Sequence, residues 1–195
     1  MRLLFITGNR GKFVEAERLL GGFGIRLEQA DLDITEPQAD TLEEVVEKCA
    51  EEALKKTEEC FIIEDSGLFV NSLNGFPGVY SSYVYRKIGC EGILKLLTGS
   101  SERSAYFMTA LAYGSSREGI KLFTGRVDGA IATGQRGESG FGYDPIFIPL
   151  GSKLTFAEMS VEEKNRFSHR ARALRAFASW FLNEKNDWKE KLKNQ

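Results

Sequence analysis

The sequence is short of cysteine and of long apolar runs, and each shortage argues against a class of protein. Three cysteines occur among the 195 residues, and these form no CxxC pair. An odd number at this spacing argues against a disulfide framework or a zinc site, so we expect a reducing, cytoplasmic setting. The longest apolar runs, such as 3–6 and 60–63, have only the length of a strand. We therefore expect no membrane span and no signal peptide.

A strong charge of either sign is also missing. The formal net charge is −2, which argues against a broad nucleic-acid-binding surface but leaves room for a local basic pocket. With 42% hydrophobic and 28% charged residues, the chain is typical of a folded protein. We expect a single domain over 1–182 and a polar tail over 183–195, in which Trp188 and Leu192 are the only large apolar residues.

Hydrophobic periodicity predicts alternating strands and helices. Capping boxes at Thr41-Leu-Glu-Glu44 and Ser160-Val-Glu-Glu163 each open a helix. A final helix places Leu174, Phe177, Ala178 and Phe181 on one face. Further helices are expected over 12–20 and 91–97, and strands over 2–7, 25–27, 61–64, 106–113, 120–127 and 146–148. In the first helix we expect Glu15 and Arg18 on the outer face. Antiparallel strands between early and late helices indicate an α/β fold with a mixed sheet.

The stretch FITGNRGKF, residues 5–13, has the outline of a phosphate-binding loop without the spacing of a P-loop. Only two residues separate Gly8 from Gly11, and Phe13 follows Lys12. Free backbone N–H groups at the start of a helix, together with a lysine, can bind phosphate by another route. The alternative is that the stretch forms only a turn between a strand and a helix.

Two acidic positions could serve a metal site. Glu64 and Asp65 close the strand predicted over 61–64, and neighbours on a strand point to opposite faces, so we favour Asp65, which lies nearer the loop. Glu36 lies in another loop. Magnesium needs only one or two carboxylates when substrate phosphates complete its shell. The alternative is a pair of solvated charges at a strand end.

Two further clusters could bind a nucleobase. Phe141 and Tyr143 are flanked by glycines, which expose aromatic faces for stacking, and Asp144 adds an acceptor. The alternative is that both rings enter the core. Near the C-terminus, basic and polar side chains gather at Lys164, Ser168, His169 and Arg170. Lys164 precedes Ser168 by four residues, one turn if the helix is continuous. This second cluster has its own alternative, an ordinary basic helix surface, as we expect for Arg172 and Arg175.

These segments together resemble the inosine triphosphate pyrophosphatase family. The resemblance is carried by TGNRGK at 7–12, EDSGL at 64–68, NGFPG at 74–78, GFGYDP at 140–145, TFAEM at 155–159, EKN at 163–165 and SHR at 168–170. The motifs follow the family's order over nearly the whole chain, to about residue 181. Glu36 precedes Pro37 here, whereas in relatives we expect proline before the glutamate.

The resemblance implies an elongated mixed α/β sheet flanked by helices, with two lobes around a central cleft, and a homodimer. It also implies Mg²⁺-dependent hydrolysis of ITP, dITP and XTP to the monophosphate and pyrophosphate, with Mn²⁺ as an alternative ion. Asp65 and Lys12 match catalytic residues, and Glu36 with Asp65 the metal site. Whether Asp65 activates water or binds metal first is left open. The matched substrate-binding residues are Thr7, Asn9, Lys12, Lys48, Ser66, Phe141, Tyr143, Asp144, Lys164, Ser168, His169 and Arg170.

Functions of other classes are also compatible with these residues. One is a metal-dependent phosphatase that removes a terminal phosphate, which orthophosphate release would reveal. Another is a nucleotide sensor without catalysis, which the presence of Glu36 and Asp65 argues against. A nucleic-acid-binding module is a more distant alternative, and the slight net acidity argues against it.

Overall fold

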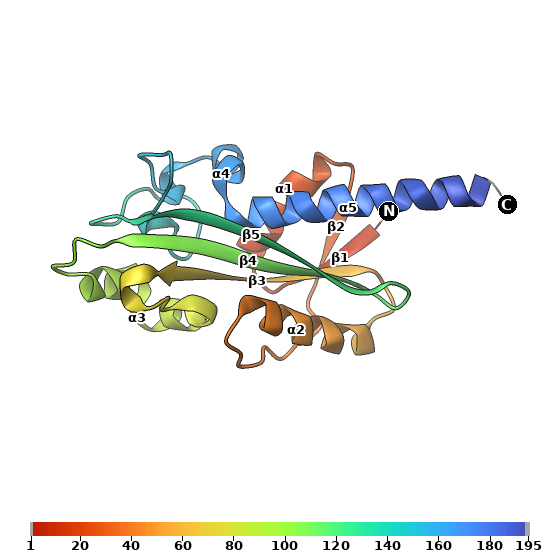
Figure 1. Ribbon diagram of the computed structural model, residues 1–195, viewed down its shortest axis with the longest axis horizontal. Helices are drawn as coiled ribbons and strands as arrows, with labels where there is room; N and C mark the ends of the chain where they lie inside the picture. The colour runs from red at the N-terminus through yellow and green to blue at the C-terminus, as the bar shows by residue number, and fades with distance from the viewer. Residues whose placement is uncertain (1, 194–195) are drawn as a thin grey trace.

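The computed structural model describes residues 2–193, with the side chains of 185–193 left out. It is an elongated α/β protein built on one six-stranded sheet of order β2-β1-β3-β4-β5-β6 (Figure 1). The strands are β1 (Arg2–Ile6), β2 (Arg26–Ala30), β3 (Phe61–Val70), β4 (Ser104–Ser115), β5 (Gly119–Ile131) and β6 (Phe147–Pro149). The helices are α1 (Arg10–Gly21), α2 (Leu42–Lys56), α3 (Ser81–Leu96), α4 (Val161–Phe167) and α5 (His169–Lys193). The predicted mixed sheet is confirmed.

Local sequence signals explain where the first helices begin. The side chain of Asn9 accepts a hydrogen bond from the Lys12 amide at 3.1 Å and so caps α1. The capping boxes predicted at Thr41 and Ser160 are both formed and open α2 and α4. Each cap satisfies backbone N–H groups that a helix start leaves without partners.

The order of the strands creates a switch point at the carboxyl end of β1. β1 pairs in parallel with β2 on one side and with β3 on the other. α1, which leads from β1 to β2, packs on one face of the sheet, and α2, which leads from β2 to β3, packs on the opposite face. In open α/β sheets, ligands bind in the crevice at such a point.

β3 is longer than predicted. It continues through Asp65, Ser66 and Gly67 to Val70, where the sequence favoured a loop. β3 pairs with β4 over its whole length, whereas β1 pairs with it only from Phe61 to Ile63. One edge of β3 is therefore free of β1 from Glu64 onward. The prediction of a strand end at Glu64 was wrong because pairing with β4 continues after β1 has stopped.

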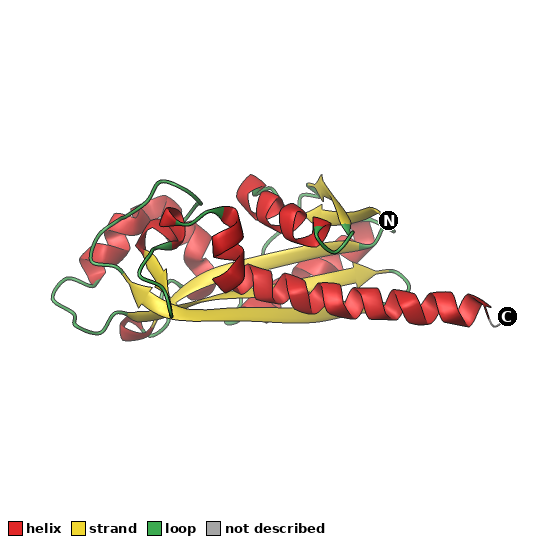
Figure 2. Ribbon diagram, turned by 90° about the horizontal axis from the view of Figure 1, so that it is seen from above, coloured by secondary structure: helices red, strands yellow, loops and turns green. Residues whose placement is uncertain are grey.

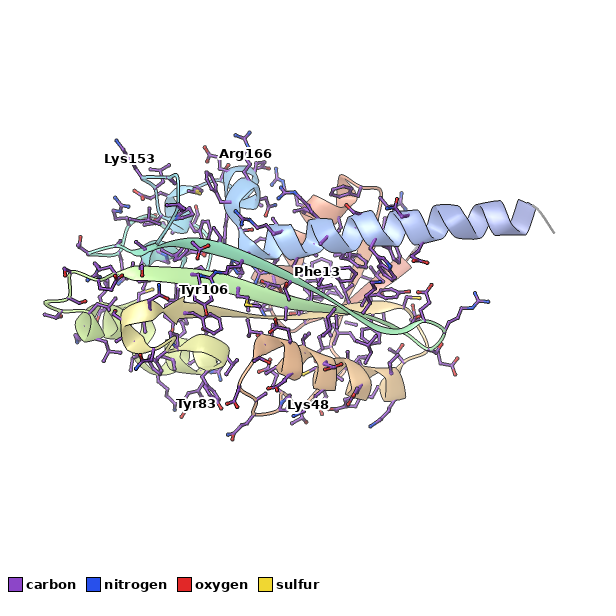
Figure 3. The ribbon with its side chains drawn as sticks, in the orientation of Figure 1. Phe13, Lys48, Tyr83, Tyr106, Lys153 and Arg166 are labelled. Carbon is purple, nitrogen blue, oxygen red and sulfur yellow. The ribbon has the colours of Figure 1, made fainter. Side chains whose placement is uncertain are left out.

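The two long strands β4 and β5 run through both halves of the molecule (Figure 1). In one half, α1 and α5 cover one face of the sheet and α2 covers the other. In the second half, α3 and the segment 143–159 cover the face that α1 and α5 cover in the first. On the opposite face of this half, Phe69, Tyr106 and Met108 stay partly exposed. We call this surface the bare sheet face, and Figure 3 labels Tyr106 on it.

Three helix predictions need correction. α3 begins at Ser81, ten residues before the predicted start at 91, and it bends at Gly89, where φ is 58°. α4 and α5 do not form one continuous helix, because Ser168 between them has an extended ψ of 147°. The expected polar tail continues α5 as helix to Lys193, which projects beyond the sheet (Figure 2). Trp188 and Leu192 belong to the side chains outside the described part, and the division at residue 182 stays a prediction.

Across the described residues, we find no helix with the length and apolar composition needed to span a bilayer.

Candidate active site

A cavity of about 480 Å³ lies at the carboxyl end of β1, along the free edge of β3. Residues from both faces of the sheet line it because it wraps around this edge. It brings together most of the predicted site residues: Thr7, Asn9, Lys12, Glu36, Asp65, Ser66, Phe141, Tyr143, Asp144, Lys164, His169 and Arg170. These residues are up to 163 positions apart in the sequence, and in the folded protein they line the same cavity.

Two predicted residues do not line the cavity. Ser168 is fully buried, and its hydroxyl accepts a hydrogen bond from the Ala171 amide at 3.2 Å. It therefore caps α5, a structural role. Lys48 is exposed on α2, and Figure 3 shows it on the outer side of the helix. In this conformation Lys48 is not placed to contact a ligand in the cavity.

Lys12 lies between the two acidic residues of β3. Its Nζ is 3.1 Å from a carboxylate oxygen of Glu64 and 3.6 Å from one of Asp65. Neighbours on a strand point to opposite faces, and this is the case here, yet both carboxylates reach the cavity because it wraps around the strand edge. The charges of Glu64 and Asp65 outweigh the effect of burial and raise the pKa of Lys12. Lys12 is therefore a permanent cation in the wall of the cavity.

Glu64 is a buried structural acid. Arg170 donates to both of its oxygens, from Nε at 3.1 Å and from Nη2 at 3.2 Å. Burial alone would raise its pKa, but the charges of Arg170 and Lys12 prevail and lower the pKa to about 2. The alternative of a solvated acidic pair is therefore wrong for Glu64, which stays ionised and holds Arg170 in place.

Asp65 and Glu36 form the acidic end of the cavity. Burial raises the pKa of Asp65; the charge of Lys12 opposes this effect, and the charge of Glu36 adds to it. Asp65 and Glu36 line a common space and fit a divalent cation, which relieves the repulsion between two carboxylates. No cluster of three or more metal-ligating His, Cys, Asp or Glu side chains occurs among the described residues. Magnesium bound by one or two carboxylates keeps several waters or takes oxygens from substrate phosphates.

Glu15 was predicted on the outer face of its helix, and this was wrong. It is only 5% exposed and binds two cations of the C-terminal cluster. Its carboxylate lies 2.7 Å from Lys164 Nζ and 2.5 Å from Arg170 Nη1. A signal in the sequence was its place three residues after Lys12, which puts both side chains on neighbouring parts of the helix surface.

The rings of Phe141 and Tyr143 lie in different environments. Tyr143 is 3% exposed and its hydroxyl donates to the Ser81 carbonyl at 3.3 Å, so most of this ring belongs to the core. Phe141 stays at the cavity, with Lys164 Nζ 4.9 Å from its ring centre. Asp144 accepts from Lys164 at 2.5 Å and from the Phe141 amide at 2.9 Å through one oxygen. Asp144 therefore fixes the loop against Lys164.

His169 is buried as a neutral side chain. Burial and the charges of Arg170, Lys164 and Lys12 hold its pKa well below the usual value of 6.5. Its ring stacks on Phe107, with centroids 4.7 Å apart and planes 9° apart, and its Nδ1 has no hydrogen-bond partner among the described residues. A buried nitrogen without a partner carries a free-energy cost that a ligand could remove. Phe107 and Glu15 are residues near the predicted base-binding cluster that the sequence analysis did not identify.

Arg170 is held almost completely by the protein. Besides the bonds to Glu64 and Glu15, its Nη2 donates to the Ser66 hydroxyl at 3.2 Å. A guanidinium has five N–H groups, and four of them are bound in this way. Ser66 in turn lies 2.6 Å from the Thr109 hydroxyl. The network orients the wall of the cavity and, among the described residues, leaves one N–H group on Arg170 and one on Lys164 to contact a ligand.

Known proteins share both this sequence and this fold. A dITP/XTP pyrophosphatase of Thermococcus kodakarensis is 54% identical over 180 residues, which cover 92% of this chain and 97% of the relative. A dITP/XTP pyrophosphatase of Methanopyrus kandleri is 50% identical over 183 residues, covering 94% and 97%. The solved structure of the Staphylococcus aureus Ham1 protein matches with a TM-score of 0.81 and 30% identity, over 94% of this chain and all of that chain. The family model described as the Ham1 family matches residues 3–180. The resemblance found in the sequence is confirmed: the chain belongs to the Ham1 family.

Proposed function

We propose that this protein hydrolyses deaminated purine nucleoside triphosphates, namely dITP, ITP and XTP, to the monophosphate and pyrophosphate. The observation that carries the proposal is a single cavity with Lys12, Asp65 and Glu36 at one end and Phe141, Lys164 and His169 at the other. The first end has groups for phosphates and a metal, the second has groups for a base. The dITP/XTP pyrophosphatases among its relatives support the same substrate class.

Glu36 and Asp65 would hold Mg²⁺, with Mn²⁺ as the alternative. A magnesium ion there supplies charge neutralisation for the phosphates and for the leaving group. Lys12, at the start of α1, holds the phosphates with the backbone amides of residues 8–10 close by. Asp65 would orient a water molecule for attack on the phosphorus between the nucleoside and the pyrophosphate. Glu64 keeps Lys12 and Arg170 in position without leaving its ion pairs.

Base selection rests on the neutral His169. Hypoxanthine and xanthine carry an oxygen acceptor at C6, where adenine carries an amine. In the tautomer with its proton on the ring nitrogen that faces the ligand, the imidazole would donate to that oxygen, and an adenine amine would face a donor instead. An unpaired buried donor of this kind can give about 10⁴-fold discrimination. The single N–H of Arg170 that the protein leaves unbound can assist.

A panel of nucleoside triphosphates tests the proposal. We expect dITP, ITP and XTP to be hydrolysed at least about 100-fold faster than ATP in kcat/KM, with one pyrophosphate released per turnover. GTP should also be slow, and because guanine shares the C6 oxygen, its rejection requires a separate contact at the C2 amine. Activity should disappear on chelation of the metal and return with Mg²⁺. Equal rates on all substrates, or release of orthophosphate alone, would contradict the proposal and favour a terminal phosphatase.

We also propose a homodimer formed through the bare sheet face, in a cytoplasmic setting. Phe69 stacks on Tyr106 at 4.8 Å, and the Arg126 guanidinium lies 3.7 Å from the Tyr106 ring centre, so a flat and partly apolar surface is preformed. Arg126 and Asp128 lie on the same strand face. A two-fold axis can bring Arg126 of one copy opposite Asp128 of the other. The three cysteines are free thiols, as suits a reducing compartment.

Sedimentation velocity tests the dimer. We expect the wild type to sediment as a dimer, Tyr106→Glu as a monomer, and the matched control Lys121→Glu, on the same sheet but exposed beyond the bare sheet face, as a dimer. A monomeric wild type, or a dimeric Tyr106→Glu variant, would refute this interface.

A further inference from the structure

The walls of the main cavity carry more negative than positive charge. Five carboxylates and three cations line it, which leaves an excess of two negative charges. The carboxylates belong to Asp31, Glu36, Glu64, Asp65 and Asp144. The cations are Lys12, Lys164 and Arg170. All three cations already lie within 2.5–3.6 Å of carboxylates. A triphosphate adds several negative charges, so a further cation is needed near its phosphates besides a metal ion.

A second, smaller cavity of about 130 Å³ lies beside the acidic end of the main cavity. We call it the annex. It shares Glu36, Val45, Asp65 and Ser82 with the main cavity, and none of the base-end residues Phe141, Lys164 or His169 lines it. The annex therefore extends the main cavity beyond Asp65 and Glu36, on the side away from the base.

Arg86 is the cation of the annex. It lies on α3, one turn after Ser82, and its Nη1 donates to the Ser82 hydroxyl at 2.7 Å. Unlike Lys12, Lys164 and Arg170, it forms no ion pair with another described residue. The remaining N–H groups of its guanidinium are free to bind an anion, and a guanidinium matches the oxygens of a phosphate with two parallel hydrogen bonds.

We propose that Arg86, held by Ser82, binds the terminal phosphate of the nucleotide in the annex, and the pyrophosphate after cleavage. The identity of the ligand rests on the proposed function. A phosphate chain that begins near Lys12 and passes Asp65 and Glu36 ends in the annex, where the unpaired guanidinium meets its most negative group. Arg86 thus acts on the leaving half of the substrate and does not contribute to the choice of base.

Calorimetric titration with pyrophosphate in the presence of Mg²⁺ tests this role. We expect Arg86→Gln to raise the dissociation constant of pyrophosphate about tenfold, since a charge-assisted hydrogen bond to phosphate is lost. Arg86→Lys, which keeps the charge but not the fork of donors, should give an intermediate value. The matched control Lys95→Gln removes one exposed cation from the same helix outside both cavities and should bind as the wild type does. The affinity for dIMP should be unchanged in all variants.

Two results would overturn the assignment. One is an Arg86→Gln variant that binds pyrophosphate as tightly as the wild type, and the other is an equal loss of affinity for pyrophosphate and dIMP. Binding requires no turnover, so the comparison stays valid even if the wild type fails to hydrolyse dITP. That failure would refute the proposed function, whereas unchanged pyrophosphate binding would refute only the role of Arg86.

Discussion

The buried carboxylate of Glu15 offers a sharp test of the network behind the cavity. Its two oxygens bind Lys164 and Arg170, and Glu15→Gln keeps the size of the side chain but removes the charge. Removing one partner of a buried ion pair costs about 3–5 kcal/mol. Asp144 and Glu64 still hold the two cations, so we expect the lower limit, about 3 kcal/mol of unfolding free energy. In a chain of this size the melting temperature should fall by about 6–12 °C.

The pH dependence of the stability difference between wild type and Glu15→Gln gives an independent check. Burial alone would raise the pKa of Glu15, but the charges of Arg170 and Lys164 hold it below its usual value. A carboxyl group whose pKa is depressed in the folded state contributes stability above its unfolded pKa, about 4.3 for glutamate, and loses it as the pH falls. The gap in stability between wild type and Glu15→Gln should therefore be full at pH 7 and narrow below about pH 4.

Urea denaturation at several pH values measures this gap. The matched control is Glu17→Gln, an exposed glutamate on the same helix, which should change stability by less than about 0.5 kcal/mol. A loss below about 1 kcal/mol for Glu15→Gln at pH 7, or a gap that stays constant from pH 7 to pH 3, would show that Glu15 does not stabilise the fold through these ion pairs.

Other predictions concern the phosphate end of the cavity. Asp65→Asn should abolish pyrophosphate release while the melting temperature stays within a few degrees; near-normal kcat would remove Asp65 from the mechanism. Lys12→Ala should lower kcat/KM for dITP about 100-fold or more, whereas Arg10→Ala should change it less than threefold, and similar losses in both would refute the role of Lys12. A Cβ on Gly11 would stand 2.6 Å from the Phe141 ring, so Gly11→Ala should displace that ring and raise KM for dITP with less effect on kcat.

The local elements could be predicted from the sequence because their signals lie within a few residues. The capping boxes at Thr41 and Ser160, the apolar run of β1 and the hairpin of β4 and β5 all occur where the patterns indicated. The motifs also identified the residues that the fold brings together in one cavity. These features depend on residues that are close together along the chain, so the sequence shows them directly.

The features that the sequence missed depend on contacts between distant segments. Glu15 and Lys164 are 149 positions apart, and their ion pair exists because α1 and α4 lie side by side. β3 extends beyond Glu64 because β4 continues to pair with it. Tyr143 enters the core because α3 offers the Ser81 carbonyl to its hydroxyl. No pattern within a single element identifies these partners from distant segments.

The same network supports the proposed roles of a metal and of a further cation in substrate binding. Lys12, Lys164 and Arg170 are cations, yet Glu15, Glu64, Asp65 and Asp144 neutralise them before a nucleotide arrives. Such pairing fixes their positions, which lowers the reorganisation needed when charge develops during the reaction. It also leaves the cavity walls acidic, so a triphosphate without a divalent ion meets repulsion from Asp65 and Glu36. We therefore propose that selectivity for the metal-bound nucleotide arises from the same ion pairs that hold the base-binding wall.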